Sequence, residues 1–114
     1  MRISRSTGSS SLFRRNRFGD LISRQLDLFE REHADVIAEA QARLDAYNRA
    51  GRDEAEELYG DYVDAVETGT EILADIRWTY LRTLDGAAAE AYEAEFNRAV
   101  AKRLPAFGLE IENR

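Results

Sequence analysis

The feature that most constrains the fold is a helical spacing of apolar side chains that runs through most of the chain, with a single proline to interrupt it. From Phe18 onward, apolar or aromatic residues recur every three or four positions, the spacing that lines one face of an α-helix. No strand is needed to account for the pattern. The sequence therefore predicts an all-α fold. The first such series consists of Ile22, Leu26, Phe29, His33, Val36, Ala40, Leu44 and Tyr47.

Three helices are predicted from this spacing and from the residues that end helices. Gly51 and the pair Asp85-Gly86 interrupt the periodicity, and Pro105 ends or kinks its last stretch. Because the loops are short, neighbouring helices must run antiparallel. The expected architecture is a long helical hairpin with a shorter third helix, an up-down-up three-helix bundle. We expect helices at about 18–49, 53–84 and 87–104, followed by a C-terminal segment at 105–114.

The third predicted helix is too short to cover the hairpin. At about 1.5 Å per residue, the first two helices each reach about 48 Å and the third about 27 Å. Two covers remain open for the apolar residues near the hairpin turn: the C-terminal residues Phe107, Leu109 and Ile111, or a second copy of the chain, which we favour. The residues concerned are Leu44, Tyr47, Leu58, Tyr59 and Tyr62.

The second predicted helix has an unusually wide apolar surface, because an arc that includes Trp78 flanks its main stripe. A middle helix must contact two neighbours, so we expect Trp78 to pack on the third helix. The alternative is that Trp78 belongs to a partner surface. Gly69, inside the same helix, either lets a neighbouring backbone come close or is a tolerated defect.

Charge is divided between a basic N-terminal segment and an acidic remainder. The formal net charge is −6, yet five arginines precede the first acid, Asp20. Residues 4–11 contain no apolar side chain, so we expect a flexible tail at 1–17 and a single domain at 18–114. We expect the tail to have no role beyond solubility, or to bind an acidic protein surface, which includes the body of this chain. Binding of nucleic acid or an anionic membrane is a further alternative, which the acidic body would oppose. The arginines are Arg2, Arg5, Arg14, Arg15 and Arg17.

One short element has the spacing of a metal site. Glu30 and His33 form an E-x-x-H pair, which resembles the element that supplies ligands in ferritin-like di-iron bundles. The resemblance implies a metal-binding bundle in which glutamates from other helices complete the shell. The acids in the middle of the second predicted helix point away from its apolar face. We therefore expect a histidine at the edge of the core and no cofactor, with metal binding as the alternative.

Composition excludes several kinds of activity. The chain has no cysteine, which excludes disulfides, thiolate zinc sites and cysteine nucleophiles. A single histidine leaves no Ser-His-Asp set, and no Gly-rich phosphate loop or small-molecule substrate can be identified. No apolar run is long enough to cross a membrane, so the expected location is the cytoplasm. We expect a non-enzymatic interaction, adaptor or regulatory protein, homodimeric or bound to a protein partner, that docks through the hairpin tip.

Overall fold

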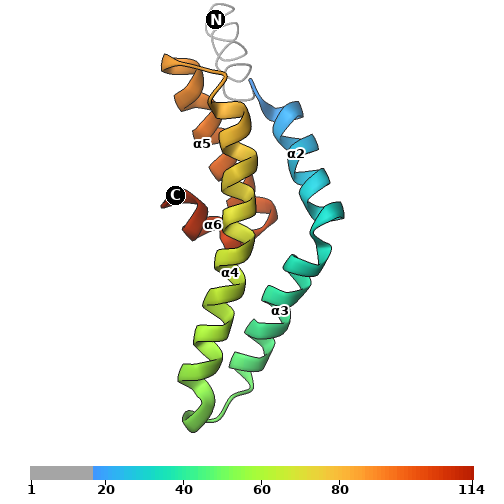
Figure 1. Cartoon of the computed structure of the whole chain (residues 1–114), viewed down its shortest axis with the longest axis vertical. Helices are drawn as coiled ribbons and strands as arrows, with labels where there is room; N and C mark the ends of the chain where they lie inside the picture. Colours follow the sequence, from blue (N-terminus) through green and yellow to red (C-terminus); the bar gives the residue numbers. More distant parts are fainter. Residues whose placement is uncertain (1–16) are drawn as a thin grey trace, which may run out of the picture.

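The computed structural model describes residues 17–114, which form five helices and no strand (Figure 1). The predicted all-α class is therefore confirmed. The segment 1–16, where the flexible tail was predicted, lies outside the described residues. The helices are α2 (Gly19–Glu32), α3 (Ala34–Asn48), α4 (Arg52–Leu81), α5 (Gly86–Arg103) and α6 (Pro105–Glu112).

The predicted hairpin is present, but its first arm consists of two helices instead of one. α3 and α4 run antiparallel and are joined by a short turn, whereas α2 packs on α5 (Figure 1). The break falls at His33, whose backbone angles are φ −126° and ψ 35°. The His33 N–H still donates to the Phe29 carbonyl at 2.8 Å, and the His33 carbonyl accepts from the N–H of Ile37 at 3.2 Å. The expectation of one continuous helix over 18–49 is wrong.

Helix α6 accounts for this break. The C-terminal segment turns back after α5 and places Phe107 between α2 and α4. Phe107 meets Phe29 edge-on, with ring centroids 6.2 Å apart, and its ring lies against Gly69 on the other side. α2 is thereby held against α5, while α3 continues along α4. Neither glycine nor proline stands next to His33, so the local sequence gives no sign of the break.

The core occupies the part of the molecule that contains α2, α5, α6 and the C-terminal half of α4. Aromatic rings meet edge to face there: Tyr92 lies 4.9 Å from Tyr80 and 5.5 Å from Phe18 between ring centroids. Such pairs add about 0.5–1.5 kcal/mol each to the gain from burial. The largest fully buried side chains are Leu26, Phe29, Leu73, Tyr92, Phe96, Val100, Phe107 and Ile111.

The other part of the molecule is an arm, formed by α3 and the first half of α4 (residues 34–65). It extends away from the core as the lower half of Figure 1. The described chain measures 62 × 33 × 24 Å and has a radius of gyration of 17.6 Å. A compact domain of this size would have about 13 Å. The described chain is therefore elongated. Of the C-terminal residues considered as a cover for the hairpin tip, Phe107 lines a pocket with Leu44 and Tyr62, Ile111 is buried, and Leu109 is 76% exposed.

Two buried charged residues were not anticipated from the periodicity. Arg77 of α4 is 4% exposed and donates to the Asn97 Oδ1 at 2.6 Å and to the Ile111 carbonyl at 3.0 Å. Glu95 of α5 accepts a hydrogen bond from the N–H of Phe18 at 3.2 Å, at the start of α2. A carboxylate there satisfies a free helix N–H and complements the helix dipole. Both residues join helices that are distant in the sequence.

Tyr92 gives the fold a measurable dependence on high pH. Its hydroxyl donates to the Gln25 Oε1 at 3.0 Å, and burial raises the pKa of Tyr92 from 10.0 to about 12. As the pH rises, the unfolded chain therefore loses this proton before the folded chain does. The stabilisation is complete below about pH 10 and is lost as the pH approaches about 12. We expect the Tyr92→Phe variant to lack this pH-dependent contribution to the free energy of unfolding.

The measurement is denaturant unfolding of the native chain and of Tyr92→Phe at a series of pH values. All other titrating groups are shared, so the difference between the two proteins isolates Tyr92. The native chain should lose more stability than the variant between about pH 10 and about pH 12. Parallel curves for the two proteins across that interval would contradict the assignment.

Candidate functional site

Three tyrosines meet near the free end of the arm and are called the tyrosine tip below. Tyr47 of α3 lies 5.3 Å from Tyr59 of α4 between ring centroids, and Tyr59 lies 6.3 Å from Tyr62. Tyr59 is 51% exposed, and the other two rings are half-buried. Leu44 and Leu58, also half-buried, lie on the same two helices. The residues singled out near the hairpin turn are thus all within the arm.

The tyrosine tip adjoins an acidic segment, residues 53–57, at the start of α4. Asp53 and Glu54 lie in the first helical turn, where the helix dipole favours negative charge. Glu56 and Glu57 follow them, beyond that turn. All four carboxylates are exposed, and none forms an ion pair with another described residue. The free end of the arm therefore combines an exposed aromatic ring with unpaired negative charge.

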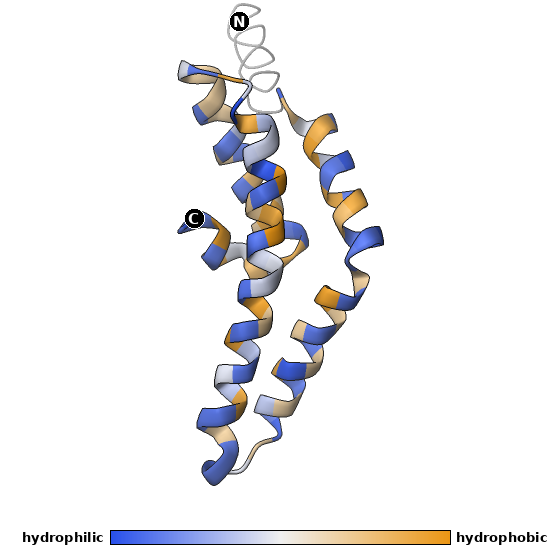
Figure 2. Ribbon diagram, viewed as in Figure 1, coloured by the Kyte–Doolittle hydropathy of each residue, from blue (hydrophilic) through white to orange (hydrophobic). Residues whose placement is uncertain are grey.

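An apolar notch of about 400 Å³ opens where the arm meets the core. Ile37 and Leu44 line it from α3, and Pro105 and Phe107 line it from α6. Tyr62 of α4 belongs both to the notch and to the tyrosine tip. Tyr62 therefore connects the notch to the tyrosine tip. Figure 2 shows hydrophobic residues interspersed with hydrophilic ones along both helices of the arm.

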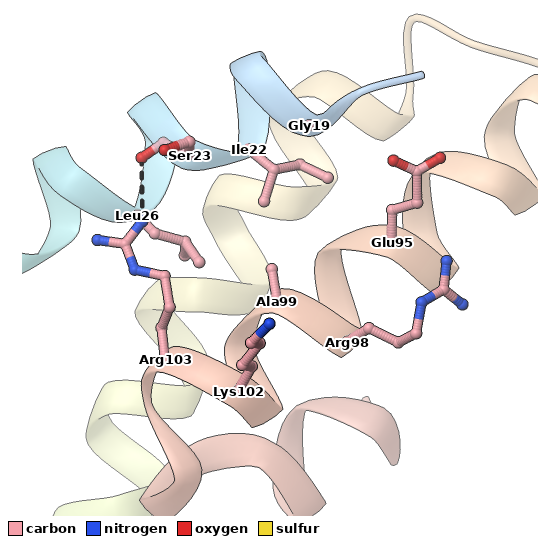
Figure 3. A pocket seen from close by; sticks show the side chains of 9 residues that line it. All are labelled: Gly19, Ile22, Ser23, Leu26, Glu95, Arg98, Ala99, Lys102 and Arg103. Atoms are coloured by element: carbon pink, nitrogen blue, oxygen red, sulfur yellow. Dashed lines mark hydrogen bonds between the residues drawn. The ribbon is translucent and has the colours of Figure 1, made fainter. Parts of the chain in front are cut away.

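A groove of about 390 Å³ lies in the core part of the molecule, between α2 and α5 (Figure 3), and Arg103 lines both this groove and the notch. The floor of the groove is apolar, and the α5 side of its rim carries three cations and one acid, Glu95, which is buried and accepts from the Phe18 N–H. Figure 3 shows Ile22 and Leu26 pointing from α2 toward Ala99 of α5. The three cations of the rim are Arg98, Lys102 and Arg103.

The three cations of the rim differ in their partners. Arg103 crosses to α2, where it donates to Asp27 at 2.8 Å and to Glu30 at 2.9 Å. The hydrogen bond to Asp27 raises the pKa of Arg103 further above its ordinary value. Arg98 and Lys102, in contrast, form no ion pair with any residue in 17–114. They are the free positive charges of the groove.

The metal candidate, Glu30 and His33, is not joined by further ligands in the described part of the chain. The Glu30 carboxylate is held by Arg103. The ring of His33 is half-buried and lies 5.5 Å from the ring of Phe29. Within residues 17–114, no three His, Asp or Glu side chains come together as a metal site would require. The arrangement thus gives the E-x-x-H pair a contact with the core and a link to α5.

Two further candidates are placed differently by the structure. Trp78 is 59% exposed, so the expectation that it packs on the third helix is wrong, and its ring remains open to a partner. Arg77, the residue before Trp78, lies on the buried face of α4, and Trp78 is therefore turned toward solvent. Of the five arginines of the tail, the structure describes Arg17, whose guanidinium lies 5.2 Å from the ring centre of Phe18. The other four lie outside the described residues.

Comparison with known proteins leaves the function to be argued from this chain's own residues. Within residues 17–114, no helix is both long enough and apolar enough to cross a bilayer. The chain matches no family model, no curated protein and no solved structure.

Proposed function

We propose that this chain is a non-enzymatic interaction protein, of the adaptor or regulatory kind, which docks through the tyrosine tip and associates with a second copy of itself. The observation that supports the proposal most strongly is the packing of the arm. Between residues 34 and 65, Ala40 is the single fully buried residue, although both helices of the arm carry leucine and tyrosine side chains. The arm is held together mainly by contacts between α3 and α4, and α6 reaches it at its base, where Pro105 and Phe107 line the notch.

Tyrosine suits the part that the proposal gives to the tip. Tyr and Trp side chains combine a large apolar area with a polar end, and they are enriched where proteins bind one another. Tyr59 already rests against Tyr47 and Tyr62, so little side-chain freedom is lost when a partner covers it. The adjoining notch offers room for an apolar side chain of the partner. The arm is therefore suited to bind a protein surface.

The metal-binding alternative receives less support. A metal at Glu30 would have to displace Arg103, which holds that carboxylate at 2.9 Å. The tail alternative rests on arginines that, apart from Arg17, lie outside the described residues. The tyrosine tip is consequently the surface on which the proposal depends.

Replacement of Tyr59 and Tyr62 by glutamate tests the proposed function. We expect the double variant Tyr59→Glu/Tyr62→Glu to lose self-association, because two carboxylates would have to be desolvated in the contact. Sedimentation equilibrium of the full chain measures the molar mass, and circular dichroism checks that the helices remain. Capture of a partner by a tagged chain gives a second readout.

Two single variants serve as comparisons. Leu109→Glu alters another exposed apolar residue, 76% exposed on α6, and should leave the molar mass and the partner capture unchanged. Trp78→Glu decides whether Trp78 belongs to the same docking surface. Docking through the tip would be refuted if the Tyr59→Glu/Tyr62→Glu chain were folded and still self-associated and captured a partner protein as the native chain does.

A further inference from the structure

The groove between α2 and α5 and the free end of the arm carry opposite charges beside apolar or aromatic side chains. At the groove, Arg98 and Lys102 form no ion pair with a described residue and stand beside an apolar floor. At the end of the arm, Glu56 and Glu57 are equally unpaired and stand beside the exposed ring of Tyr59. The groove thus offers positive charge and an apolar surface, and the tip offers negative charge and an aromatic side chain.

The helix dipole explains only part of the basic rim. Cations in the last turn of a helix are stabilised by the carbonyl end of the dipole, which accounts for Lys102 and Arg103. Arg98 lies more than one turn before the end of α5, where this effect has faded. The helix dipole therefore does not account for the position of Arg98, whose exposed guanidinium is available to a partner.

A single chain cannot bring residues 53–59, at the free end of its arm, to its own groove. From Leu26, in the groove, to the end of α3 at Asn48, the helices span roughly 33 Å at about 1.5 Å per residue. Figure 1 shows the end of the arm and the start of α2 at opposite ends of the long axis. Two chains packed antiparallel, in contrast, place each tip beside the other chain's groove. One twofold axis then makes both contacts identical.

We propose that the groove between α2 and α5 receives the acidic end of the arm, residues 53–59, from a second copy of the chain. Tyr59 of one copy lies on the apolar floor, and the acidic side chains of residues 53–57 face Arg98 and Lys102 of the other. The groove volume of about 390 Å³ lies in the lower part of the range of about 300–1,000 Å³ found for ligand pockets, so it is large enough to receive an aromatic side chain. This inference rests on the proposed function and adds to it the surface to which the tip binds.

The chain offers a direct test, because Lys102 is its single lysine. A carbodiimide joins a lysine amine to a carboxylate that touches it, without a spacer. Treatment of an equal mixture of isotopically labelled and unlabelled full chains distinguishes links between copies from links within one copy. We expect mixed-isotope peptides that join Lys102 to residues 53–57. The inference would be overturned if the links between copies joined Lys102 mainly to acids outside residues 53–57. It would also be overturned if a chain that sediments as a dimer gave no links between copies.

Charge reversal provides the second arm of the test. We expect Arg98→Glu/Lys102→Glu to weaken self-association at least about tenfold, and Glu56→Lys/Glu57→Lys to do the same. The chain that carries all four changes should recover to within about threefold of the native affinity. The native association should also weaken between about 50 mM and about 500 mM salt, as exposed charge pairs are screened.

Matched controls carry the same change of charge elsewhere. Arg82→Glu/Arg114→Glu alters two exposed arginines outside the groove, and Glu71→Lys/Asp75→Lys alters two exposed acids on the outer face of α4. Both should leave self-association within about twofold of native, apart from the screened effect of net charge. If the chain with all four substitutions self-associates no more tightly than either double variant, direct pairing of tip and groove is refuted.

The outcomes also separate this inference from the proposed function. A native chain that is monomeric at every concentration, yet loses a captured partner on Tyr59→Glu/Tyr62→Glu, overturns the tip-in-groove dimer and leaves docking through the tip intact. A dimer that resists groove reversal but is lost on the tyrosine changes likewise overturns the groove as the binding surface and keeps the tip. Loss of self-association on groove reversal, with restoration by tip reversal, supports both.

Discussion

Replacement of Phe107 by alanine is expected to lower the free energy of unfolding by about 3–5 kcal/mol, the usual loss when a buried phenylalanine is truncated. Phe107 is 1% exposed, and it fills the space between Phe29 of α2 and Gly69 of α4. Those helices would otherwise face a void, because α2 packs on α5 and not along α4. Urea denaturation of the native and variant chains measures the loss. A loss below about 1 kcal/mol would show that the site collapses around the missing ring.

Gly69 supplies the paired variant for this prediction. A Cβ at this position would lie 2.8 Å from the Phe107 Cζ, closer than such atoms pack, so Gly69→Ala should cost about 1–3 kcal/mol by overpacking. In the Phe107→Ala chain the obstacle is gone, and the same change should be neutral or stabilising by up to about 1 kcal/mol, the helix preference of alanine.

The matched control is Gly60→Ala in the same helix. A Cβ there meets nothing within 4 Å, so the change should stabilise the native chain by up to about 1 kcal/mol. Urea denaturation of the single and double variants completes the cycle. If Gly69→Ala behaves like Gly60→Ala in the native background, the close contact with Phe107 is not what requires a glycine at position 69.

Local periodicity was enough to predict α4 and α5, but it did not predict the division of the first arm into α2 and α3 or the helical structure of the C-terminal segment, α6. The predicted range 53–84 corresponds to α4 and 87–104 to α5, because Gly51, Asp85-Gly86 and Pro105 act on their immediate neighbours. The apolar stripe of the first arm also holds where it meets the core: Ile22, Leu26 and Phe29 are all buried. For Gly69, the sequence left close approach of a backbone and a tolerated defect both open; the structure shows a close approach, but by the Phe107 ring and not by a backbone.

Non-local packing decided what periodicity could not predict. The break at His33 depends on α6, more than 70 residues later in the chain, and the helical spacing runs through the break undisturbed. The burial of Arg77 is equally non-local, since its partners belong to α5 and α6. A charged residue on a helix is normally exposed. Sequence spacing alone therefore assigned Trp78, and not its neighbour Arg77, to the inner surface.

Of the two surfaces in the candidate site, the tyrosine tip could be predicted from local features of the sequence, whereas the groove depends on non-local packing. The tyrosine tip followed from the length mismatch, which needs only the helix lengths. The groove required knowledge that α2 packs on α5, because its floor comes from one helix and its basic rim from the other. Lys102 had a clear signal in the sequence as the single lysine, but its position in the linear chain did not show which helix it would face.

Removal of the Arg77 side chain is expected to release α6 from the core. The guanidinium donates to the Asn97 Oδ1 of α5 and to the Ile111 carbonyl in the last turn of α6, and it lies 3.9 Å from the Glu93 carboxylate. The Ile111 carbonyl also accepts from the N–H of Arg114 at 3.2 Å, so the guanidinium adds a second hydrogen bond there and complements the helix dipole. Arg77→Ala removes the hydrogen bonds to both side-chain and backbone acceptors and opens a cavity, at a combined cost of about 2–4 kcal/mol.

Hydrogen exchange locates the effect of this change, because local opening is measured segment by segment. The amides of α6 should lose more protection in Arg77→Ala than those of α3, which Arg77 does not contact through a hydrogen bond. Arg77→Met keeps most of the volume and should recover part of the stability but not the protection of α6. Arg82→Ala, an exposed arginine just after α4, should stay within about 0.5 kcal/mol of the native chain. Uniform loss of protection across all helices would show instead that Arg77 supports the whole core and not the docking of α6.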